Sequence, residues 1–248
     1  MTMDRQVERI HRTNAEFWNA DGDAALGAIS LPDYGAFVSE DALNLFGDLR
    51  GRRVLELGCG RGDSLKYAFE RGASELYGID IAPRQIERAR ANLAARGIQA
   101  KLVCAPMEAA CGIPVGYFDF VYSIYGIGWT TDLDLTFRRI HSYLKPGGAL
   151  IFSWSHPVHK CVSSENGRLV FCNSYFDEAW YRADLDGEAI VLANRKLSTY
   201  VNALADNGFV IEKLVEETDG VRAEAENTPF GRKARMLPVT FVIRARRR

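Results

Sequence analysis

Residues 54–80 constrain the fold of this chain more than any other segment, because they combine two strand patterns with a glycine loop and a helix pattern. The apolar run at residues 53–57 predicts a strand, and the glycines at alternate positions of residues 58–62 predict a tight loop after it. Asp63 is a residue type that favours the start of a helix. A second apolar run then ends on Asp80. This order predicts a βαβ unit with a ligand-binding loop at its first turn.

The residues of this unit favour a nucleoside-containing ligand. Glycine lets the backbone pass close to a bound molecule, and the start of a helix offers unpaired N–H groups. Asp80, at the end of the second strand, is placed to accept hydrogen bonds from ribose hydroxyls. The loop differs from the G-x-G-x-x-G of dinucleotide enzymes because position 63 is Asp. Glu56, two residues before the first glycine, would repel a pyrophosphate but favour a cationic amino group.

Strand and helix patterns alternate along the rest of the chain. Further strands are expected at residues 100–104, 118–123, 149–154, 209–215 and 237–245, and further helices at 84–96, 132–144 and 197–207. Because helices separate successive strands, this order predicts an α/β fold with a doubly wound, mainly parallel sheet. The 248 residues show no repeat and no dividing linker, so a single domain is expected.

Three short motifs carry a family resemblance. E-L-G-C-G-R-G at residues 56–62, F-D-x-V-x-S at 118–123 and L-K-P-G-G at 144–148 resemble motifs of the class I S-adenosylmethionine-dependent methyltransferases. The resemblance implies a Rossmann-like sheet of seven strands, with the last strand antiparallel and inserted beside the fifth. It also implies S-adenosyl-L-methionine as the cofactor and S-adenosyl-L-homocysteine as the product. The resemblance is good over residues 50–155, moderate over 197–245 and poor elsewhere, so it supports cofactor binding better than any one substrate.

The resemblance also implies roles for individual residues. Glu56 and the loop backbone would hold the methionine part of the cofactor, Asp80 the ribose, and Ile81 would pack on the adenine. Many relatives carry an acid at the position matched by Pro106, so here the adenine contact would fall to the residues after it. The expected cofactor-binding residues are Trp18, Glu56, Gly58, Cys59, Gly60, Gly62, Asp80, Ile81, Met107, Glu108 and Ser123.

Catalysis needs few residues in such an enzyme. Methyl transfer from a sulfonium is an in-line displacement, so the protein mainly positions the acceptor and excludes water. An oxygen or nitrogen acceptor also needs a base for its proton. His156 is the first candidate, because it follows the fifth strand at the ligand edge and titrates near neutrality; His159 and Tyr125 are next. The alternative is that His156 only caps or hydrogen-bonds its own loop.

Three regions flank the cofactor-binding half at residues 51–154. Residues 1–50 are expected to form a helical cap or lid, with Phe17-Trp18 facing the ligand, or simply to cover one face of the sheet. Residues 155–196 are expected to be an insertion that forms the substrate pocket, or an ordinary surface embellishment. Residues 197–248 hold the last helix and two strands.

Local patterns predict some details of these regions. Apolar spacing predicts helices at residues 1–20 and 40–49. The Asn166-Gly167 pair predicts a hairpin. Residues 216–236 are polar and charged, which predicts a mobile loop.

Composition excludes several classes of partner. The formal net charge is −1, so neither a nucleic acid nor an anionic membrane is expected to bind, and no apolar run approaches the ~20 residues of a membrane span. The five cysteines form no C-x-x-C pair, and residues 1–20 hold no apolar segment typical of a secretion signal, so a cytoplasmic protein is expected. No metal is expected, because Asp132 is explained as a helix N-cap. A homodimer is compatible with these features.

The sequence therefore predicts an enzyme that methylates oxygen or nitrogen of a small organic molecule, as in secondary metabolism. C-methylation of an activated carbon is the alternative, since such an acceptor needs little base. A protein that only binds the cofactor is a further alternative. A nucleic-acid methyltransferase is disfavoured by the absence of a basic stripe and of an N/D-P-P-Y/F motif. An NAD-dependent oxidoreductase is disfavoured by the spacing of the glycine loop.

Overall fold

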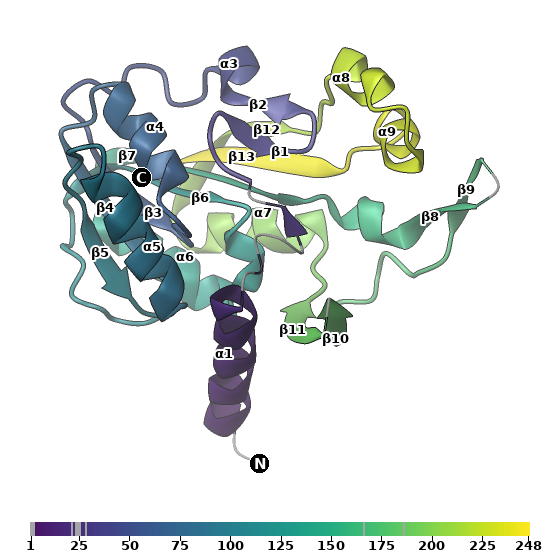
Figure 1. Ribbon diagram of the computed structural model, residues 1–248, viewed down its shortest axis with the longest axis horizontal. Helices are drawn as coiled ribbons and strands as arrows, with labels where there is room; N and C mark the ends of the chain where they lie inside the picture. Colours follow the sequence, from purple (N-terminus) through teal and green to yellow (C-terminus); the bar gives the residue numbers. More distant parts are fainter. Residues whose placement is uncertain (1–2, 21, 23–25, 28, 166, 186) are drawn as a thin grey trace.

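A seven-stranded sheet runs through the middle of the molecule in the computed structural model (Figure 1). The structure describes residues 3–20, 22, 26–27, 29–165, 167–185 and 187–248. The strands of the sheet, in spatial order, are β12 (Phe209–Val215), β13 (Thr240–Arg247), β7 (Leu144–Ser155), β6 (Phe118–Ile124), β3 (Arg53–Leu57), β4 (Glu75–Asp80) and β5 (Lys101–Cys104). Only β13 is antiparallel to its neighbours in this sheet, and it lies beside β7, the fifth strand to enter it. The predicted doubly wound, mainly parallel fold is confirmed.

Helices cover both faces of this sheet, which explains its nearly continuous apolar strands. These include α4 (Asp63–Glu70), α5 (Pro83–Ala94), α6 (Leu133–Tyr143) and α7 (Leu197–Asp206). Successive strand residues point to opposite faces, so Leu55 packs in one core with Phe137 of α6, while Val54 packs in the other with Leu65 of α4. Both cores therefore hold β3 at the centre of the sheet.

The strand order reverses between β3 and β6, and the chain after β6 crosses the end of β3 there. Ser123 Oγ donates a hydrogen bond of 2.8 Å to Leu57 O, which ties the two strand ends together. A Cβ atom at Gly126 would lie 2.5 Å from Ser123 Oγ and 2.7 Å from Leu57 O. Only glycine therefore lets the chain pass so close, and this crossing opens the crevice where open α/β sheets bind ligands.

The N-terminal region is only partly as predicted. The first helix is present as α1 (Met3–Asn19), but the helix expected at residues 40–49 ends early, as α3 (Glu40–Leu43). The cause is the buried carboxylate of Glu40, which accepts hydrogen bonds from Leu45 N and Phe46 N at 2.8 and 2.9 Å. These bonds turn the chain, so Leu45 and Phe46 are buried from a loop instead of a helix. A short ladder of β1 (Asp33–Gly35) and β2 (Val38–Ser39) precedes this turn.

The segment after β7 forms a short helix and two hairpins. These are η2 (Pro157–Cys161), the pair β8 (Val162–Glu165) and β9 (Arg168–Phe171), and the pair β10 (Trp180–Leu185) and β11 (Glu188–Ala193). The first hairpin lies where the Asn-Gly pair predicts it; Asn166 itself lies outside the described residues, and Gly167 has a φ of 75°. The second hairpin was not predicted, although the sequence has another turn-favouring pair, Asp186-Gly187, between its two strands; Asp186 itself lies outside the described residues. In Figure 1, β8 and β9 extend away from the sheet, whereas β10 and β11 lie near α1.

The prediction of a mobile loop at residues 216–236 is wrong, because this segment folds into α8 (Gly220–Ala225) and α9 (Pro229–Ala234). Asp219 caps the first helix by accepting from Val221 N and Arg222 N, each at 3.0 Å. Thr228 caps the second by accepting from Gly231 N at 3.0 Å. Thr-Pro is an ordinary pair of N-cap and first-turn residues. The prediction relied on the charged composition of the segment and overlooked this pair.

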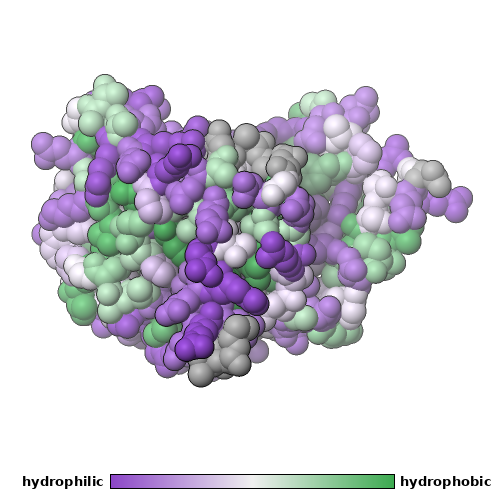
Figure 2. Space-filling view, turned by 60° about the horizontal axis from the view of Figure 1, so that its bottom comes forward, coloured by the Kyte–Doolittle hydropathy of each residue, from purple (hydrophilic) through white to green (hydrophobic). Residues whose placement is uncertain are grey.

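The side of the molecule that carries α1 faces the reader in Figure 2, where hydrophilic and hydrophobic side chains alternate over the surface. The outward residues of α1 are charged and exposed, whereas Ile10 and Phe17 are buried. This pattern is typical of an amphipathic helix that packs along one stripe. In the described part of the chain, no helix combines the length and the apolar character that crossing a membrane requires.

Candidate functional site

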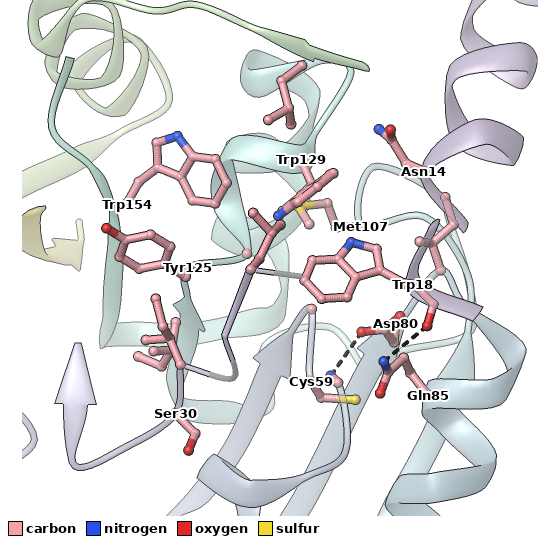
Figure 3. Close-up of a pocket in the computed structure, with 18 of the residues that line it drawn as sticks. Asn14, Trp18, Ser30, Cys59, Asp80, Gln85, Met107, Tyr125, Trp129 and Trp154 are labelled. Atoms are coloured by element: carbon pink, nitrogen blue, oxygen red, sulfur yellow. Dashed lines mark hydrogen bonds between the residues drawn. The ribbon is translucent and has the colours of Figure 1, made fainter. Parts of the chain in front are cut away.

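A cavity of about 520 Å³ lies at the carboxyl ends of the parallel strands. Its walls come from α1, the glycine loop after β3, the segments after β4, β5, β6 and β7, both strands β10 and β11, and α9. Figure 3 shows side chains from these separate segments pointing into one space. Open α/β sheets bind their ligands at this edge, so we take the cavity as the candidate active site.

The glycine loop lies along one side of the cavity in a conformation that favours glycine. Gly58, Gly60 and Gly62 have φ angles of 71°, 48° and 80°, all in the left-handed region. Gly58 and Gly60 line the cavity with their backbone. Gly62 lies behind the wall, where a Cβ atom would be 3.2 Å from Leu93 Cδ1 of α5. The first two glycines thus shape the site, and the third lets α4 and α5 approach each other.

Asp80 fixes the loop from the end of β4. Its Oδ2 accepts a hydrogen bond from Gly60 N and its Oδ1 one from Ala82 N, both at 2.9 Å. The side chain is nearly buried but lines the cavity, and Ile81 follows it in the wall. A carboxylate oxygen can accept two hydrogen bonds, so these contacts orient Asp80 toward a ligand that donates from a diol.

Glu56 is a buried acid with an unsatisfied oxygen. Its side chain lines the cavity at 2% exposure, and its Oε2 has no hydrogen-bond partner among the described residues. Burial raises the pKa of Glu56 well above its usual range, and the negative charges of Asp80 and Asp63 add to this effect. A buried carboxylate without a counter-charge favours a cationic ligand group.

Glu108 lines the cavity but is mostly engaged in holding its walls. Its Oε1 accepts from Thr131 N and Thr131 Oγ1 at 2.6 Å, from Thr130 Oγ1 at 3.1 Å and from His11 Nε2 at 3.3 Å. Burial acts to raise the pKa of Glu108, but the hydrogen bonds from His11 and Thr131 lower it to about 2. The carboxylate therefore joins α1 to the start of α6. Met107, beside it, also lines the cavity.

Aromatic rings surround the middle of the cavity. Trp18 of α1 lies 5.1 Å from Trp129 of η1 (Ile127–Trp129), which lies 6.3 Å from Trp154 of β7, between ring centroids. Tyr125 lies 5.3 Å from Trp154, and its hydroxyl is 3.2 Å from Thr240 Oγ1. Figure 3 shows Trp18, Trp129, Trp154 and Tyr125 around the same space. These rings offer an apolar, rigid surface to a small organic molecule.

The structure does not bring His156 or Ser123 to the cavity wall. Both are buried and neither lines the cavity, and the Ser123 hydroxyl is used at the end of β3. His156 Nδ1 accepts from Val158 N at 3.2 Å, and its Nε2 lies 2.7 Å from Glu216 Oε1. With both ring nitrogens engaged, His156 caps η2, in agreement with the alternative for this histidine.

His159, three residues later, does line the cavity. Its Nδ1 is buried without a hydrogen-bond partner among the described residues. Burial lowers the pKa of His159 to about 4, and the nearby charges of Lys233 and Lys160 act in the same direction. The imidazole is therefore neutral at pH 7, and one of its nitrogens has no hydrogen-bond partner in the described chain.

Two functional contacts have no clear sequence signal. Asn14 of α1 donates from Nδ2 to Val191 O at 2.9 Å and accepts at Oδ1 from Val191 N at 2.8 Å. It thereby holds β11 against α1, and Ile190 and Leu192 of β11 line the cavity. A polar residue on the apolar face of α1 is the one hint of this role. The second contact joins Lys160 of η2 and Tyr181 of β10, which both line the cavity.

The acids after η1 have structural partners. Asp132 caps α6 by accepting from Leu135 N at 2.8 Å, and Asp134 Oδ1 accepts from Asn207 Nδ2 at 2.6 Å. Across the residues that the structure describes, no cluster of three or more His, Cys, Asp or Glu side chains is arranged to hold a metal ion.

Comparison with known proteins agrees with this geometry. A family model described as a methyltransferase domain matches residues 54–148. The aklanonic acid methyltransferase DauC of Streptomyces sp. (strain C5) is 35% identical over 105 residues, which are 42% of this chain and 48% of that protein. The ubiquinone biosynthesis O-methyltransferase of Bordetella avium is 31% identical over 109 residues, 44% of this chain and 45% of that protein. The matched parts thus span less than half the length of these two curated relatives.

A solved structure covers much more of the chain. The crystal structure of an S-adenosylmethionine-dependent methyltransferase from Mesorhizobium loti superposes with a TM-score of 0.72 and 28% sequence identity. The superposition covers 86% of this chain and 99% of that one.

The hydrogen bonds of Glu108 predict a specific dependence of stability on pH. In the folded chain the pKa of Glu108 is about 2, below the usual 4.5. The stabilisation that the ionised carboxylate gives the fold is therefore complete above about pH 4.5 and is lost as the pH falls toward 2. It amounts to about 3 kcal/mol. We expect Glu108→Gln to remove most of this pH dependence, as measured by urea unfolding between pH 2 and 5. The exposed Glu188→Gln is the control, and an equal pH dependence in Glu108→Gln and wild type would contradict this role.

Proposed function

Because the chain belongs to the class I S-adenosylmethionine-dependent methyltransferases, we propose that it transfers a methyl group to an oxygen or nitrogen atom of a small organic molecule. The observation that carries this proposal is the position of Glu56. Its buried and unsatisfied oxygen lies beside the backbone of Gly58 and Gly60, with Asp80 at the end of the neighbouring strand. This arrangement fits a ligand that has both a cationic amino group and a ribose.

The cavity residues fit S-adenosylmethionine on chemical grounds. In our assignment Glu56 and the backbone of Gly58, Cys59 and Gly60 receive the methionine part. Asp80 accepts from the ribose hydroxyls. The apolar surface near Ile81 and Met107 receives the adenine, with Trp18 closing the site from α1. Glu108 supports this wall from behind, Gly62 sets the approach of α4, and Ser123 fixes the strand ends, so these three act through their neighbours.

The rest of the chain has to bind the acceptor and manage its proton. When bound, S-adenosylmethionine supplies a methyl group on a positively charged sulfur, which leaves as the neutral thioether when an acceptor lone pair forms the new bond. The aromatic wall of Trp129, Trp154 and Tyr125 holds the acceptor away from water. We assign α1 as the cap over the cofactor and residues 155–196 as the part that forms the acceptor pocket.

His159 is our candidate base for the proton that an oxygen or nitrogen acceptor loses. It is neutral at pH 7 and has a buried nitrogen without a partner in the described chain. Tyr125 is less suited to this step, because burial raises the pKa of its hydroxyl and keeps it protonated. The low pKa of His159 also favours the alternative of C-methylation, since an activated carbon needs only a weak base.

The cysteines support a proposal for the compartment. All five of them are unpaired thiols. Unpaired thiols suit a reducing compartment, so we place the enzyme in the cytoplasm.

Cofactor binding is the first test. Calorimetry should show binding of S-adenosylmethionine and none of NAD, and Asp80→Ala should weaken binding by roughly 1–3 kcal/mol, the scale of a lost charge-assisted hydrogen bond. Asp206→Ala, at an exposed position, is the matched control. Binding of NAD instead of S-adenosylmethionine would overturn the proposal. A mass-spectrometric screen for methylated metabolites then identifies the acceptor.

Glu56→Gln should weaken cofactor binding without lowering the stability of the fold. The neutral amide removes a charge-assisted contact, so we expect affinity for S-adenosylmethionine to fall roughly tenfold to a hundredfold. The raised pKa of Glu56 means that the folded protein holds a proton that the unfolded chain releases, so this group costs stability as the pH rises above 4.5. The ligand-free variant should therefore melt at or above the wild-type temperature at pH 7.

Proton release provides the internal check on Glu56. Cofactor binding to wild type should release a proton and tighten as the pH rises toward neutrality, because Glu56 must ionise to receive an ammonium group. Calorimetry in two buffers of different ionisation enthalpy measures this release, with the exposed Glu87→Gln as control. Unchanged affinity and proton release in Glu56→Gln would contradict the assignment.

His159→Gln distinguishes the two kinds of acceptor. With an oxygen or nitrogen acceptor, loss of the base should lower kcat roughly 10²- to 10⁴-fold, while cofactor affinity stays within about twofold. Steady-state kinetics with the acceptor from the screen measures this effect, and His141→Gln on α6 is the control. A loss below about tenfold would instead favour C-methylation.

A further inference from the structure

Acidic side chains predominate at one end of the cavity and basic ones at the other. The acids that line it, Glu56, Asp63, Asp80 and Glu108, all lie on the side of the glycine loop and the first strands, where Arg61 pairs with Asp63 at 3.4 Å. On the side of the segment after β7, the titratable residues of the lining are His159, Lys160 and Tyr181. The first end fits the cationic part of the cofactor, so the second end is the one that remains for the acceptor.

Lys160 is a half-buried cation that has no counter-ion among the described residues. In the ranges that the structure describes, no carboxylate lies within ion-pair distance of its ammonium group, which donates one hydrogen bond to the Tyr181 hydroxyl. An ammonium group has three N–H donors, so two remain for a ligand. Burial, and then the charge of Arg195, lower the pKa of Lys160 to about 8, so it is still mostly protonated at pH 7.

The neighbouring cations differ from Lys160 in this respect. Lys233 donates to His159 O and to Val162 O. Arg195 donates to Gly128 O and Thr130 O. Both groups hold backbone carbonyls, which is a structural use. Lys160 has no such bond, and it faces the cavity.

Tyr181 adds a second donor at the same point. Its oxygen accepts from Lys160, so its own proton is available to another acceptor. Burial raises the pKa of Tyr181 to about 12, which keeps that proton in place. The walls around the pair are apolar, with Ile190, Leu192 and Phe230 in the lining. An ammonium group and a phenol in apolar surroundings are suited to an anionic oxygen.

We propose that the methyl acceptor is an apolar or aromatic carboxylate, whose anionic group binds to Lys160 and Tyr181. This inference rests on the proposed function only in naming the bound molecule as the methyl acceptor. The carboxylate supplies the counter-charge that no described residue provides at Lys160, while the body of the acceptor packs on the aromatic wall. It also offsets the repulsion that Lys160 exerts on a proton at His159, so binding makes His159 a better base.

Matched probes of equal shape and different charge test the anion site. We choose the pairs benzoate and benzamide, and 2-naphthoate and 2-naphthamide, titrated by calorimetry into the full chain saturated with S-adenosylhomocysteine. Wild type should bind at least one carboxylate about tenfold or more tightly than its amide. Lys160→Met should bring the two affinities of that pair within about twofold, whereas Lys213→Met, at an exposed position of β12, should keep the wild-type preference.

The outcomes separate the two proposals. Affinity for S-adenosylhomocysteine, measured for every variant beforehand, reports the proposed function and the integrity of the fold. If S-adenosylhomocysteine fails to bind, the proposed function is contradicted. The same probe titrations of the ligand-free protein then still test whether the anion site exists. Equal affinity for acid and amide in wild type, failure of both carboxylates to bind at millimolar concentration, or a preference that survives Lys160→Met each overturn the inference.

Discussion

The hydrogen bond from Gly60 N to Asp80 Oδ2 is the contact on which the rest of the site depends. It joins the glycine loop to the end of β4, and Gly58 N and Cys59 N join the same loop to Ile79 O at 2.8 and 3.0 Å. The space beside Gly60 is open, because a Cβ atom there would meet nothing within 4 Å. Asp80 and the backbone of β4 thus hold the loop between the end of β3, which carries Glu56, and the start of α4.

Two ionisable groups of opposite type face the cavity without an ionic partner. Among the residues that the structure describes, Glu56 has an unsatisfied buried oxygen at one end, and Lys160 has no counter-ion at the other. Such groups destabilise a folded chain, because burial without a partner costs free energy. Their presence within one cavity is understood if ligands complete them: an ammonium group at Glu56 and an anionic oxygen at Lys160. In our proposal the same arrangement orients two different molecules, and no single group binds both.

Local sequence patterns were sufficient to predict the cofactor-binding half of the fold. Strand β3, the loop and α4 follow from apolar runs, alternate glycines and a helix-starting Asp63, each of which acts over a few residues. The residue that we propose as the base was harder to predict. His156 and His159 occupy the same short segment, and no periodicity says which one faces the cavity. The N-cap of η2 determines which histidine faces the cavity. His156 Nδ1 accepts a hydrogen bond from Val158 N, and the following turn places His159 in the cavity wall.

By itself the sequence determined the sheet, the glycine loop and the acid at the end of β4, because hydrophobic period and turn residues are local and the parallel order follows from them. Only the tertiary structure showed which residues meet at the end of the cavity that we propose for the acceptor. Asn14 meets Val191 across 177 positions, Glu108 meets Thr131 across 23, and Lys160 meets Tyr181 across 21. Such pairs depend on how loops and hairpins pack, and the residue types of either partner alone do not specify the other.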